Sequence, residues 1–177
     1  GGFPVVYGTA YSALATKAKL KKNEICVILG ATGGVGMAAI EIAKARKAIV
    51  IACGGNDEKL SECLKKGADY VLNYNNKIIR QELRKLGVSE VDVVIDMVGG
   101  QSSLDLVKSL KWNGRLIVVG FTSGNIQEIP ANRLLLKNAK VEGLYWGELA
   151  YRNPNEIGED FKALEKLYIE NKLSPSI

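Results

Sequence analysis

Short, nearly continuous apolar runs alternate along the chain with longer segments in which apolar residues recur every three or four positions. Runs of the first kind are typical of strands buried on both faces, and segments of the second kind are typical of amphipathic helices. The pattern predicts strands over Ile25–Leu29, Ala48–Ala52, Tyr70–Leu72, Val91–Asp96, Arg115–Val119 and Lys140–Tyr145. It predicts helices over Phe3–Lys17, Val35–Ala45, Glu58–Lys66, Ile78–Leu86, Ser102–Leu110 and Glu156–Asn171.

This alternation indicates a fold class, because parallel strands need crossover helices and these helices cover both faces of the sheet. The 177 residues suffice for one such domain and are too few for two of ordinary size. We therefore expect an α/β fold with a doubly wound, six-stranded parallel sheet of the Rossmann type, in the strand order 3-2-1-4-5-6. A ligand is expected at the carboxyl ends of strands 1 and 4, where the strand order reverses.

The first predicted strand runs without a spacer into a glycine turn and then into an Ala-rich helix. The spacing is Gly30-x-x-Gly33-x-x-Gly36, with Ala31 where the commonest dinucleotide-binding fingerprint has its first glycine. Gly33 and Gly34 lack a Cβ, so a pyrophosphate can approach the backbone and the positive end of the helix. We expect the N–H groups of Gly33, Gly34, Val35 and Gly36 to hold the pyrophosphate, with Gly36 also letting the helix pack close to the strand and Thr32 as a further cofactor-binding residue. The alternative is a tight turn with a purely structural role.

The end of the second predicted strand indicates which cofactor binds. Enzymes that use NAD place an acidic side chain there for the ribose 2′-hydroxyl, and that carboxylate repels a 2′-phosphate. This chain instead has Cys53, Gly54 and Gly55, and Asp57 is placed where it or Asn56 can cap the next helix. Lys59 can reach a phosphate, and Tyr74 can donate its hydroxyl after the third strand. The pattern favours NADPH, although Lys59 can equally lie on a solvated helix face.

Composition and charge disfavour several other classes of function. The net charge is +5, and its densest cluster, formed by Lys17, Lys19, Lys21 and Lys22, is interpreted as a solvated connector. Basic residues are not interleaved with aromatic ones, so a nucleic-acid partner is not favoured. No apolar run reaches the length of a membrane span, so no membrane partner is expected. There is no histidine, which removes the commonest general base and metal ligand.

The cysteines Cys26, Cys53 and Cys63 are not spaced as a zinc or redox pair. Reduced thiols packed as small apolar groups indicate a reducing compartment. We expect the cytoplasm, with the mitochondrial matrix as the alternative because the native N-terminus is not recognisable. The opening Gly1-Gly2 can be a cloning remnant, and we expect the chain to be an excised piece of a longer protein.

With these elements assigned, the chain resembles the cofactor domain of the medium-chain dehydrogenase/reductase superfamily. Within it, the chain is most similar to the zinc-independent quinone oxidoreductase branch, the zeta-crystallin-like one. The segments that carry the resemblance span nearly the whole chain in family order: Tyr7-Gly8-Thr9-Ala10-Tyr11, Gly33-Gly34-Val35-Gly36, Glu58-Lys59-Leu60, Gly67-Ala68-Asp69, Val91 to Gly100, Gly114-Arg115-Leu116, Gly120 to Gly124, and Leu134 to Asn138.

The resemblance implies a domain arrangement. Residues 1–177 would form an NADP-binding domain that is part of a two-domain enzyme, with residues 1–20 as a crossover helix from a catalytic domain. The chain stops at Leu173–Ile177, about where the family re-enters that second domain. Val5 occupies the place of a metal-ligating cysteine in zinc-using relatives, so no metal is expected.

The resemblance also implies further cofactor contacts. Lys59 and Tyr74 match residues that contact the 2′-phosphate. Thr9 would face the nicotinamide or bond back to a helix carbonyl, and both interpretations stay open. Val98 would cover the adenosine or pack in the core, while Gly120, Phe121 and Ser123 would line the nicotinamide pocket or form a polar turn. Tyr145 follows the edge strand, which would be a homodimer face or a ligand face.

Together these features predict an NADPH-dependent oxidoreductase that passes hydride from the nicotinamide to a quinone or an activated enone without zinc. We identify no catalytic residue, because no side chain is a convincing proton donor, and we expect the fragment alone to be inactive. One alternative is an NADPH enoyl or alkenal reductase of the same superfamily. Another is a non-catalytic NADPH-binding protein, either crystallin-like or RNA-binding.

Overall fold

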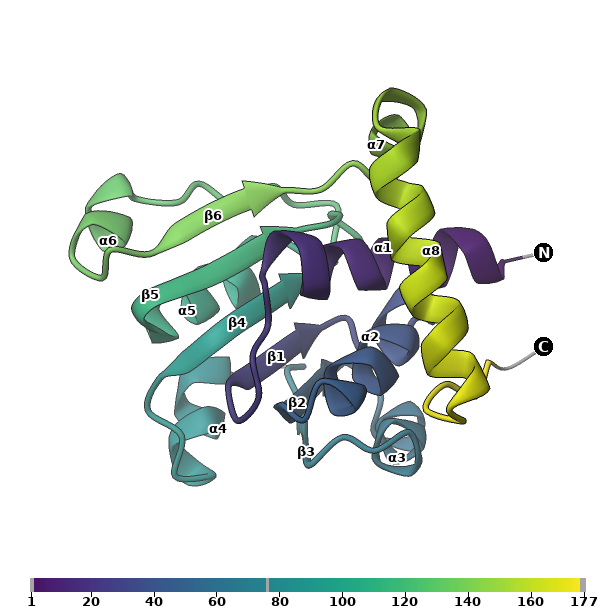
Figure 1. Cartoon of the computed structure of the whole chain (residues 1–177). Coiled ribbons are helices and arrows are strands. Elements are labelled where there is room, and N and C mark those ends of the chain that lie inside the picture. The colour runs from purple at the N-terminus through teal and green to yellow at the C-terminus, as the bar shows by residue number, and fades with distance from the viewer. Residues whose placement is uncertain (1, 76, 176–177) are drawn as a thin grey trace.

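The computed structural model describes residues 2–75 and 77–175, so Gly1, Asn76, Ser176 and Ile177 at the ends and middle of the predicted domain lie outside the described residues. The described residues form a six-stranded sheet in the order β3-β2-β1-β4-β5-β6, in which every neighbouring pair is parallel (Figure 1). This confirms the predicted fold class and strand order. The strands are β1 (Ile25–Leu29), β2 (Ile49–Gly54), β3 (Tyr70–Asn73), β4 (Val91–Asp96), β5 (Leu110–Val118) and β6 (Lys140–Gly143).

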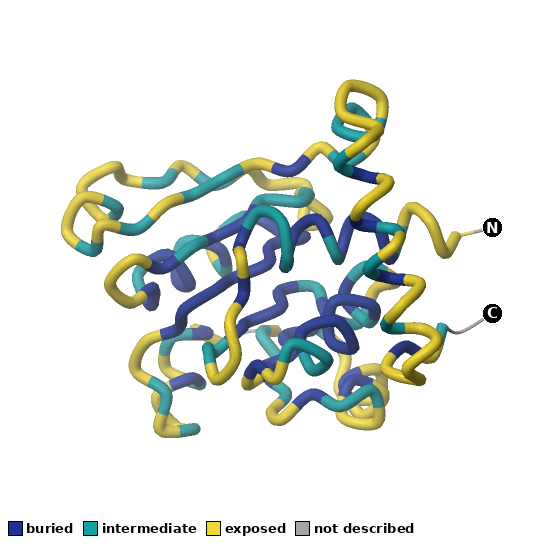
Figure 2. Tube along the Cα trace, viewed as in Figure 1, coloured by how far each residue is buried: buried dark blue, intermediate teal, exposed yellow. Residues whose placement is uncertain are grey.

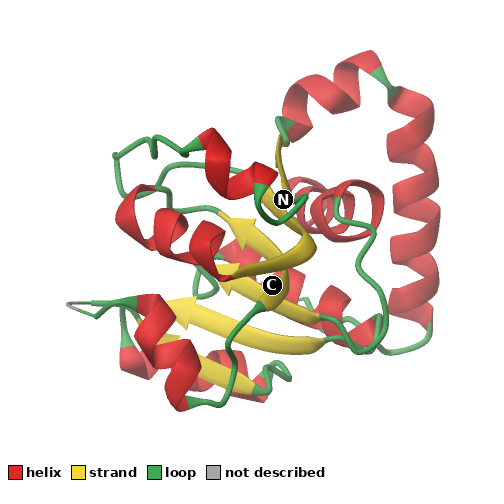
Figure 3. Cartoon of the chain, turned by 90° about the vertical axis from the view of Figure 1, so that its left-hand side faces the viewer, coloured by secondary structure: helices red, strands yellow, loops and turns green. Residues whose placement is uncertain are grey.

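Helices cover both faces of the sheet, as Figure 3 shows. They are α1 (Phe3–Tyr11), the π-helical segment η1 (Ser12–Lys17), α2 (Gly34–Ala45), α3 (Asp57–Lys65), α4 (Ile79–Lys85), α5 (Gly100–Ser109), α6 (Ala131–Leu135), α7 (Trp146–Arg152) and α8 (Pro154–Ile169). Buried residues of α1, η1, α2, α3 and α8 share one apolar cluster with one face of the strands. Buried residues of α4 and α5 share the other cluster with the opposite face.

The continuous apolar runs explain why the central strands lie where they do. Every residue of β4 is buried, and β1 is buried from Cys26 onward, between β2 on one side and β4 on the other. Alternate side chains of these strands enter opposite clusters: Ile28 lies in one and Leu29 in the other. Figure 2 shows the resulting buried centre, with the α6–β6 and α7–α8 regions much more exposed.

The structure differs from the predicted elements mainly in irregular regions. The predicted helix over Phe3–Lys17 exists, but its second half is π-helical. Strand β5 begins at Leu110, five positions before the predicted Arg115, because Leu110 pairs with Val91 ahead of a register shift in β4. The short helices α6 and α7 were not predicted, since neither contains a buried residue that would produce a helical apolar period.

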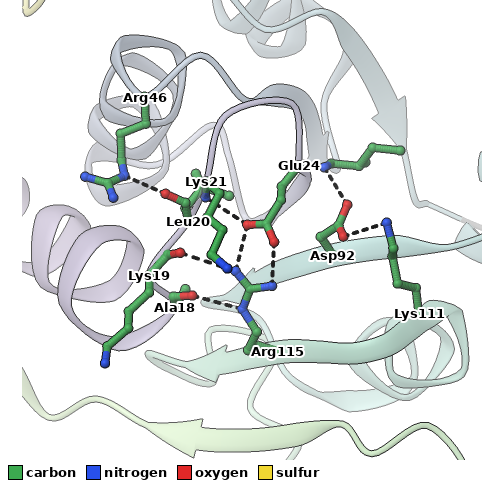
Figure 4. Close-up of polar contacts among 10 residues, drawn as sticks. Ala18, Lys19, Leu20, Lys21, Glu24, Arg46, Asp92, Lys111 and Arg115 are labelled. Atoms are coloured by element: carbon green, nitrogen blue, oxygen red, sulfur yellow. Dashed lines mark hydrogen bonds and ion pairs between the residues drawn. The ribbon is translucent and has the colours of Figure 1, made fainter.

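Charged side chains fasten the segment before β1 to the amino edge of the sheet (Figure 4). The Arg115 guanidinium donates to both Glu24 carboxylate oxygens at 2.8 and 2.7 Å, and its Nε donates to the Ala18 carbonyl at 2.9 Å. The Asp92 carboxylate accepts from the Ile25 main-chain N–H at 2.9 Å and pairs with Lys111 at 2.8 Å. These contacts fix the position of the start of β1. Because the glycine turn follows the carboxyl end of the same strand, they also help to fix the position of that turn.

We predict that Arg115→Met destabilises the fold by about 2–3 kcal/mol, because it leaves the mostly buried Glu24 carboxylate without its partner. Urea unfolding followed by circular dichroism measures this loss. The matched control is Arg152→Met, whose pair with Glu148 is exposed and should contribute less than about 0.5 kcal/mol. Equal losses in the two variants would contradict a structural role for the Arg115–Glu24 pair.

Candidate functional site

The turn between β1 and α2 is held against the end of β2. Gly30 has a φ of +89°, a conformation that favours glycine, and a Cβ there would lie 3.0 Å from a methyl of Val98. The main-chain N–H groups of Gly30 and Ala31 both donate to the Cys53 carbonyl, at 3.0 and 2.9 Å. The turn is therefore a fixed part of the carboxyl edge of the sheet.

Helix α2 begins with unpaired donors. Its N-cap residue, Gly33, has an extended backbone and no side chain to accept a hydrogen bond. The first N–H bonded within the helix is that of Met37, which donates to the Gly33 carbonyl at 2.9 Å. Among the described residues, the N–H groups of Gly34, Val35 and Gly36 have no hydrogen-bond acceptor. Three such donors at the positive end of a twelve-residue helix are suited to an anion such as a pyrophosphate.

The three glycines of the turn have different roles. A Cβ on Gly36 would lie 2.5 Å from both the Ala31 Cα and the Gly30 carbonyl oxygen, so this glycine is required for the helix to pack on the turn. A Cβ on Gly33 would have only the Gly30 carbonyl oxygen nearby, at 3.6 Å, and one on Gly34 would meet only methyls of Val6. The backbone at Gly33 and Gly34 is thus open on the side where a ligand would approach.

A groove of about 500 Å³ lies beside this open backbone. Its lining includes Thr32, Gly33 and Gly34 from the turn and Val6 and Tyr7 from α1. The Tyr7 hydroxyl donates to the buried Glu41 carboxylate at 2.6 Å; burial and then this hydrogen bond raise the pKa of Tyr7. Glu41 also accepts from the Lys66 ammonium at 2.7 Å, so one carboxylate joins α1, α2 and the end of α3.

The ends of β2 and β3 form a polar rim next to the turn. Asn56, not Asp57, caps α3, since its side chain accepts from the Lys59 main-chain N–H at 2.9 Å. Asp57 instead accepts from the Asn73 amide at 2.8 Å, and Asn75 donates to the Gly55 carbonyl at 2.5 Å. Sequence reasoning did not identify Asn73 and Asn75, although their position at the end of a predicted strand was a signal.

The predicted 2′-phosphate residues flank this rim. The Lys59 side chain is exposed and has no ion-pair partner in the described chain, and its charge lies in the first turn of α3, where the helix dipole disfavours a cation. Tyr74 is half-buried against the cluster shared with α4 and α5, and burial, followed by the nearby Cys53 thiol, raises its pKa. Gly54 approaches Thr32 so closely that a Cβ would lie 2.7 Å from the threonine methyl.

A buried carboxylate shapes the other half of the edge. Asp96, at the end of β4 and 0% exposed, accepts from the N–H groups of Val98 and Gly99, each at 2.9 Å. Its second oxygen accepts from the Gln127 amide at 3.2 Å, which ties the β4 turn to the loop after β5. The sequence marked the strand end but did not indicate that Asp96 organises it, because an aspartate there can equally be a surface residue.

The predicted nicotinamide-side residues lie on that loop and on α1. Ser123 donates its hydroxyl to the Val98 carbonyl at 2.7 Å, and Val98 is buried. Phe121 is 42% exposed, and its ring would lie 2.9 Å from a Cβ on Gly99. Thr9 is buried within α1, on the element that also lines the groove. Its role, like those of Val98, Gly120, Phe121 and Ser123, stays a prediction.

The structure therefore brings most of the predicted residues to one edge. Thr9 lies on α1. The others lie at or after the carboxyl ends of β1 to β5: the turn residues, Gly54, Lys59, Tyr74, Val98, Gly120, Phe121 and Ser123. Tyr145 is 79% exposed just after the edge strand β6, and a dimer through this strand stays a prediction. Within residues 2–75 and 77–175, no helix combines the length and apolarity needed to cross a membrane.

The described residues do not fit a metal site. No group of three or more His, Cys, Asp or Glu side chains among them is placed to hold an ion. The chain has no histidine, and Cys26, Cys53 and Cys63 are each buried. Burial raises the pKa of all three thiols, to about 12 for Cys53 and about 11 for Cys63, which keeps them protonated.

Comparison with known proteins places this geometry in context. A family model described as zinc-binding dehydrogenase matches residues 34–166. Quinone oxidoreductase-like protein 2 from Bos taurus is 39% identical over 176 residues, which are 98% of this chain and 50% of that protein. The quinone oxidoreductase from Thermus thermophilus, solved alone and with NADPH, is 28% identical with a TM-score of 0.78, covering 90% of this chain and 50% of that one.

A solved structure of similar extent is the nucleotide-binding subdomain of the enoylreductase domain of PpsC from Mycobacterium tuberculosis. It is 27% identical with a TM-score of 0.85, and the match covers 97% of both chains. By contrast, the present chain spans about half the length of the curated relatives that it matches. Its likeness to them is a likeness to their cofactor-binding part.

We predict that Gly36→Ala destabilises the fold by about 3 kcal/mol, since the added methyl collides with backbone that cannot move aside. Gly33→Ala should cost less than about 1 kcal/mol, because its methyl makes only an ordinary contact with the Gly30 carbonyl oxygen and only the N-cap preference is lost. Thermal and urea unfolding of both variants checks the difference. Similar losses in the two would mean that the turn is not packed as described.

Proposed function

The chain belongs to the zinc-binding dehydrogenase family of the medium-chain dehydrogenase/reductase superfamily, and on this premise we propose that it is the NADPH-binding part of a zinc-independent oxidoreductase. The acceptor of the hydride is a quinone or an activated enone. The observation that carries the proposal is the start of α2, where three unpaired N–H groups adjoin backbone that has no Cβ.

The residues present fit a dinucleotide. The N–H groups of Gly34, Val35 and Gly36 would hold the pyrophosphate, and Gly33 and Gly34 leave the space for it. Gly36 itself acts by fixing the direction of the helix. The rigid hydrogen bonds from Gly30 and Ala31 to Cys53 keep these donors in place before the ligand arrives, so little ordering is needed on binding.

A preference for NADPH over NADH is supported at the rim formed by β2 and β3. The strand end carries Gly54 instead of a carboxylate, and the nearby acid Asp57 already accepts a hydrogen bond from Asn73. The unpaired ammonium of Lys59 is left to bind a 2′-phosphate, with the Tyr74 hydroxyl as a second donor. Asn56 fixes the backbone that carries Lys59 in the first turn of α3, next to the rim.

The nicotinamide, when bound, supplies the hydride, and the chain's contribution is position and exclusion of water. The loop after β5 is attached to the β4 turn by the contacts of Asp96 with Gln127 and of Ser123 with Val98. This attachment holds the Phe121 ring next to Gly99 at the edge of the sheet. There the Phe121 side chain would shield the reacting face of a bound nicotinamide from water. No side chain of this chain is assigned a proton-transfer step.

An enoyl reductase of the same superfamily is the second candidate. It is supported by the match of this chain to the PpsC enoylreductase subdomain over almost its full extent. At the carboxyl edge, the described residues are all assigned to the cofactor. The side chains that select a quinone or an enone are therefore expected to be those that would contact the hydride acceptor above this edge. A non-catalytic NADPH-binding protein is the third candidate. It would bind the same cofactor as the two reductases but would reduce neither a quinone nor an enone.

We predict that calorimetric titration finds tighter binding of NADPH than of NADH. Lys59→Ala should remove most of this preference, because a charge-assisted contact contributes about 1.5–3 kcal/mol, or roughly tenfold to a hundredfold in affinity. Lys65→Ala is the matched control on the same helix, since its ammonium pairs with Glu62 and should leave both affinities unchanged. Equal affinities for NADPH and NADH in the unaltered chain would defeat the assignment of NADPH.

We predict that the 177-residue chain binds NADPH but oxidises it no faster than buffer in the presence of quinones and enones. The reason is that the described residues supply a cofactor site and no enclosing substrate pocket at the carboxyl edge. Loss of NADPH absorbance under saturating nucleotide measures this. Rapid quinone or enone reduction by the chain alone would show that the acceptor site is contained within it.

A further inference from the structure

A second groove, of about 590 Å³, lies at the amino edge of the sheet, where the strands begin. The carboxyl edge holds the proposed cofactor site, so this groove is separate from it. Its lining includes Lys19 and Lys21 from the segment after η1, Trp112 and Asn113 from the first part of β5, and Asn138 and Lys140 just before and at the start of β6.

The acidic residues of the groove are already neutralised. Glu24 accepts two hydrogen bonds from Arg115, and Asp92 pairs with Lys111 while also accepting from a main-chain N–H (Figure 4). Arg115 is also largely engaged, because its Nε and Nη2 donate to the carbonyls of Ala18 and Lys19, at 2.9 and 3.5 Å. These groups form a rigid floor that has little net charge and few donors left for a ligand.

Three lysines on the rim are not used in this way. Lys19, Lys21 and Lys140 are exposed, and none of their ammonium groups forms an ion pair within the described part of the chain. Figure 4 shows the Lys19 side chain extending away from the Arg115–Glu24 pair to an ammonium that meets no drawn partner. Lys140 stands beside Arg115 in the register of β5 and β6. The groove therefore presents unopposed positive charge above a neutral floor.

An aromatic ring and two amides complete the groove. Trp112 is 63% exposed, although tryptophan is usually among the most buried side chains by area. Asn113 and Asn138, which are hydrogen-bonded to each other, both have left-handed backbones, with φ of +61° and +45°. Lys19 also has a positive φ, of +48°, so three of the lining residues have a backbone conformation that L side chains rarely adopt.

We propose that this groove binds a nucleoside monophosphate, with the base stacked on Trp112 and the phosphate between Lys19, Lys21 and Lys140. An exposed indole provides a stacking face for any base, and the lysines provide the counter-charge for a dianion. The amide groups of Asn113 and Asn138 offer both donors and acceptors at the edge of that face. The volume suits a ligand of this size.

The test is a titration of the ¹⁵N-labelled chain with AMP, adenosine or ribose 5-phosphate, followed by heteronuclear NMR. The chain has two tryptophans, so it gives two indole signals, which Trp112→Phe assigns. We expect AMP to shift the Trp112 indole and the main-chain amides of Asn113, Asn138 and Lys140. Adenosine and ribose 5-phosphate should each bind at least about tenfold more weakly, because each lacks one of the two contacts.

Occupation of the cofactor site does not confuse the result, because that site is read from different signals, those of Gly33 to Gly36. Saturating NADPH should leave the AMP titration of Trp112 in place. Failure of NADPH to bind would count against the proposed function alone, while failure of AMP to shift Trp112 would count against this groove alone.

The matched variants are Lys140→Glu and Lys22→Glu. Both reverse one exposed lysine, but Lys22 lies outside the groove lining, one residue after Lys21. Lys140→Glu should weaken AMP about tenfold or more, and Lys22→Glu less than about twofold. Equal weakening by both variants, or equal affinity for AMP and ribose 5-phosphate, would reduce the groove to a diffuse positive surface and overturn the proposal.

Discussion

The contact between the first turn of α2 and the backbone of the preceding turn is the constraint on which the site depends. Gly36 is the residue that permits it, since any Cβ there would overlap Ala31 and the Gly30 carbonyl. The contact directs the helix axis and its three unpaired N–H groups at one point on the carboxyl edge. The same edge is built up on both sides, by the rim after β2 and β3 and by the Asp96 turn after β4. Each of these parts is useful to a dinucleotide only if the helix start is in place.

The two edges of the sheet use charge in opposite ways. At the carboxyl edge the partial positive charge comes from the main chain, and Lys59, which has no ion-pair partner among the described residues, stands beside the rim where the helix dipole disfavours a cation. At the amino edge the Arg115 guanidinium donates to the Ala18 carbonyl after η1 and pairs with the Glu24 carboxylate. Because Glu24 is neutralised in this way, the lysines around Trp112 have no opposing charge in the groove. Structural needs account for Arg115, but they do not account for Lys59, Lys140 or the exposure of Trp112.

Periodicity predicted the sheet well because a parallel sheet buried on both faces requires continuous apolar runs such as Ile25 to Leu29. It predicted the glycine turn because a bare backbone has a direct sequence signal. It could not predict the side-chain hydrogen bonds that shape the rest of the edge. Asp96, Asn73 and Asn75 act through partners distant in sequence, and a polar residue after a strand looks the same whether it organises a loop or faces water. Helices α6 and α7 were missed because neither buries a face, so neither gives a periodic apolar pattern in the sequence.

Helix α1 shows how a segment far from the glycine turn becomes part of the site. Its Val6 methyls form the wall opposite Gly34, so the width of the groove depends on where α1 lies against α2. That position is fixed by the Tyr7 hydroxyl on Glu41, a buried carboxylate that cannot be left without donors. Lys66 supplies a second donor to the same carboxylate, which draws the end of α3 toward it. Because α3 also carries Lys59, one carboxylate coordinates the wall of the pyrophosphate groove with the helix that bears the proposed 2′-phosphate contact.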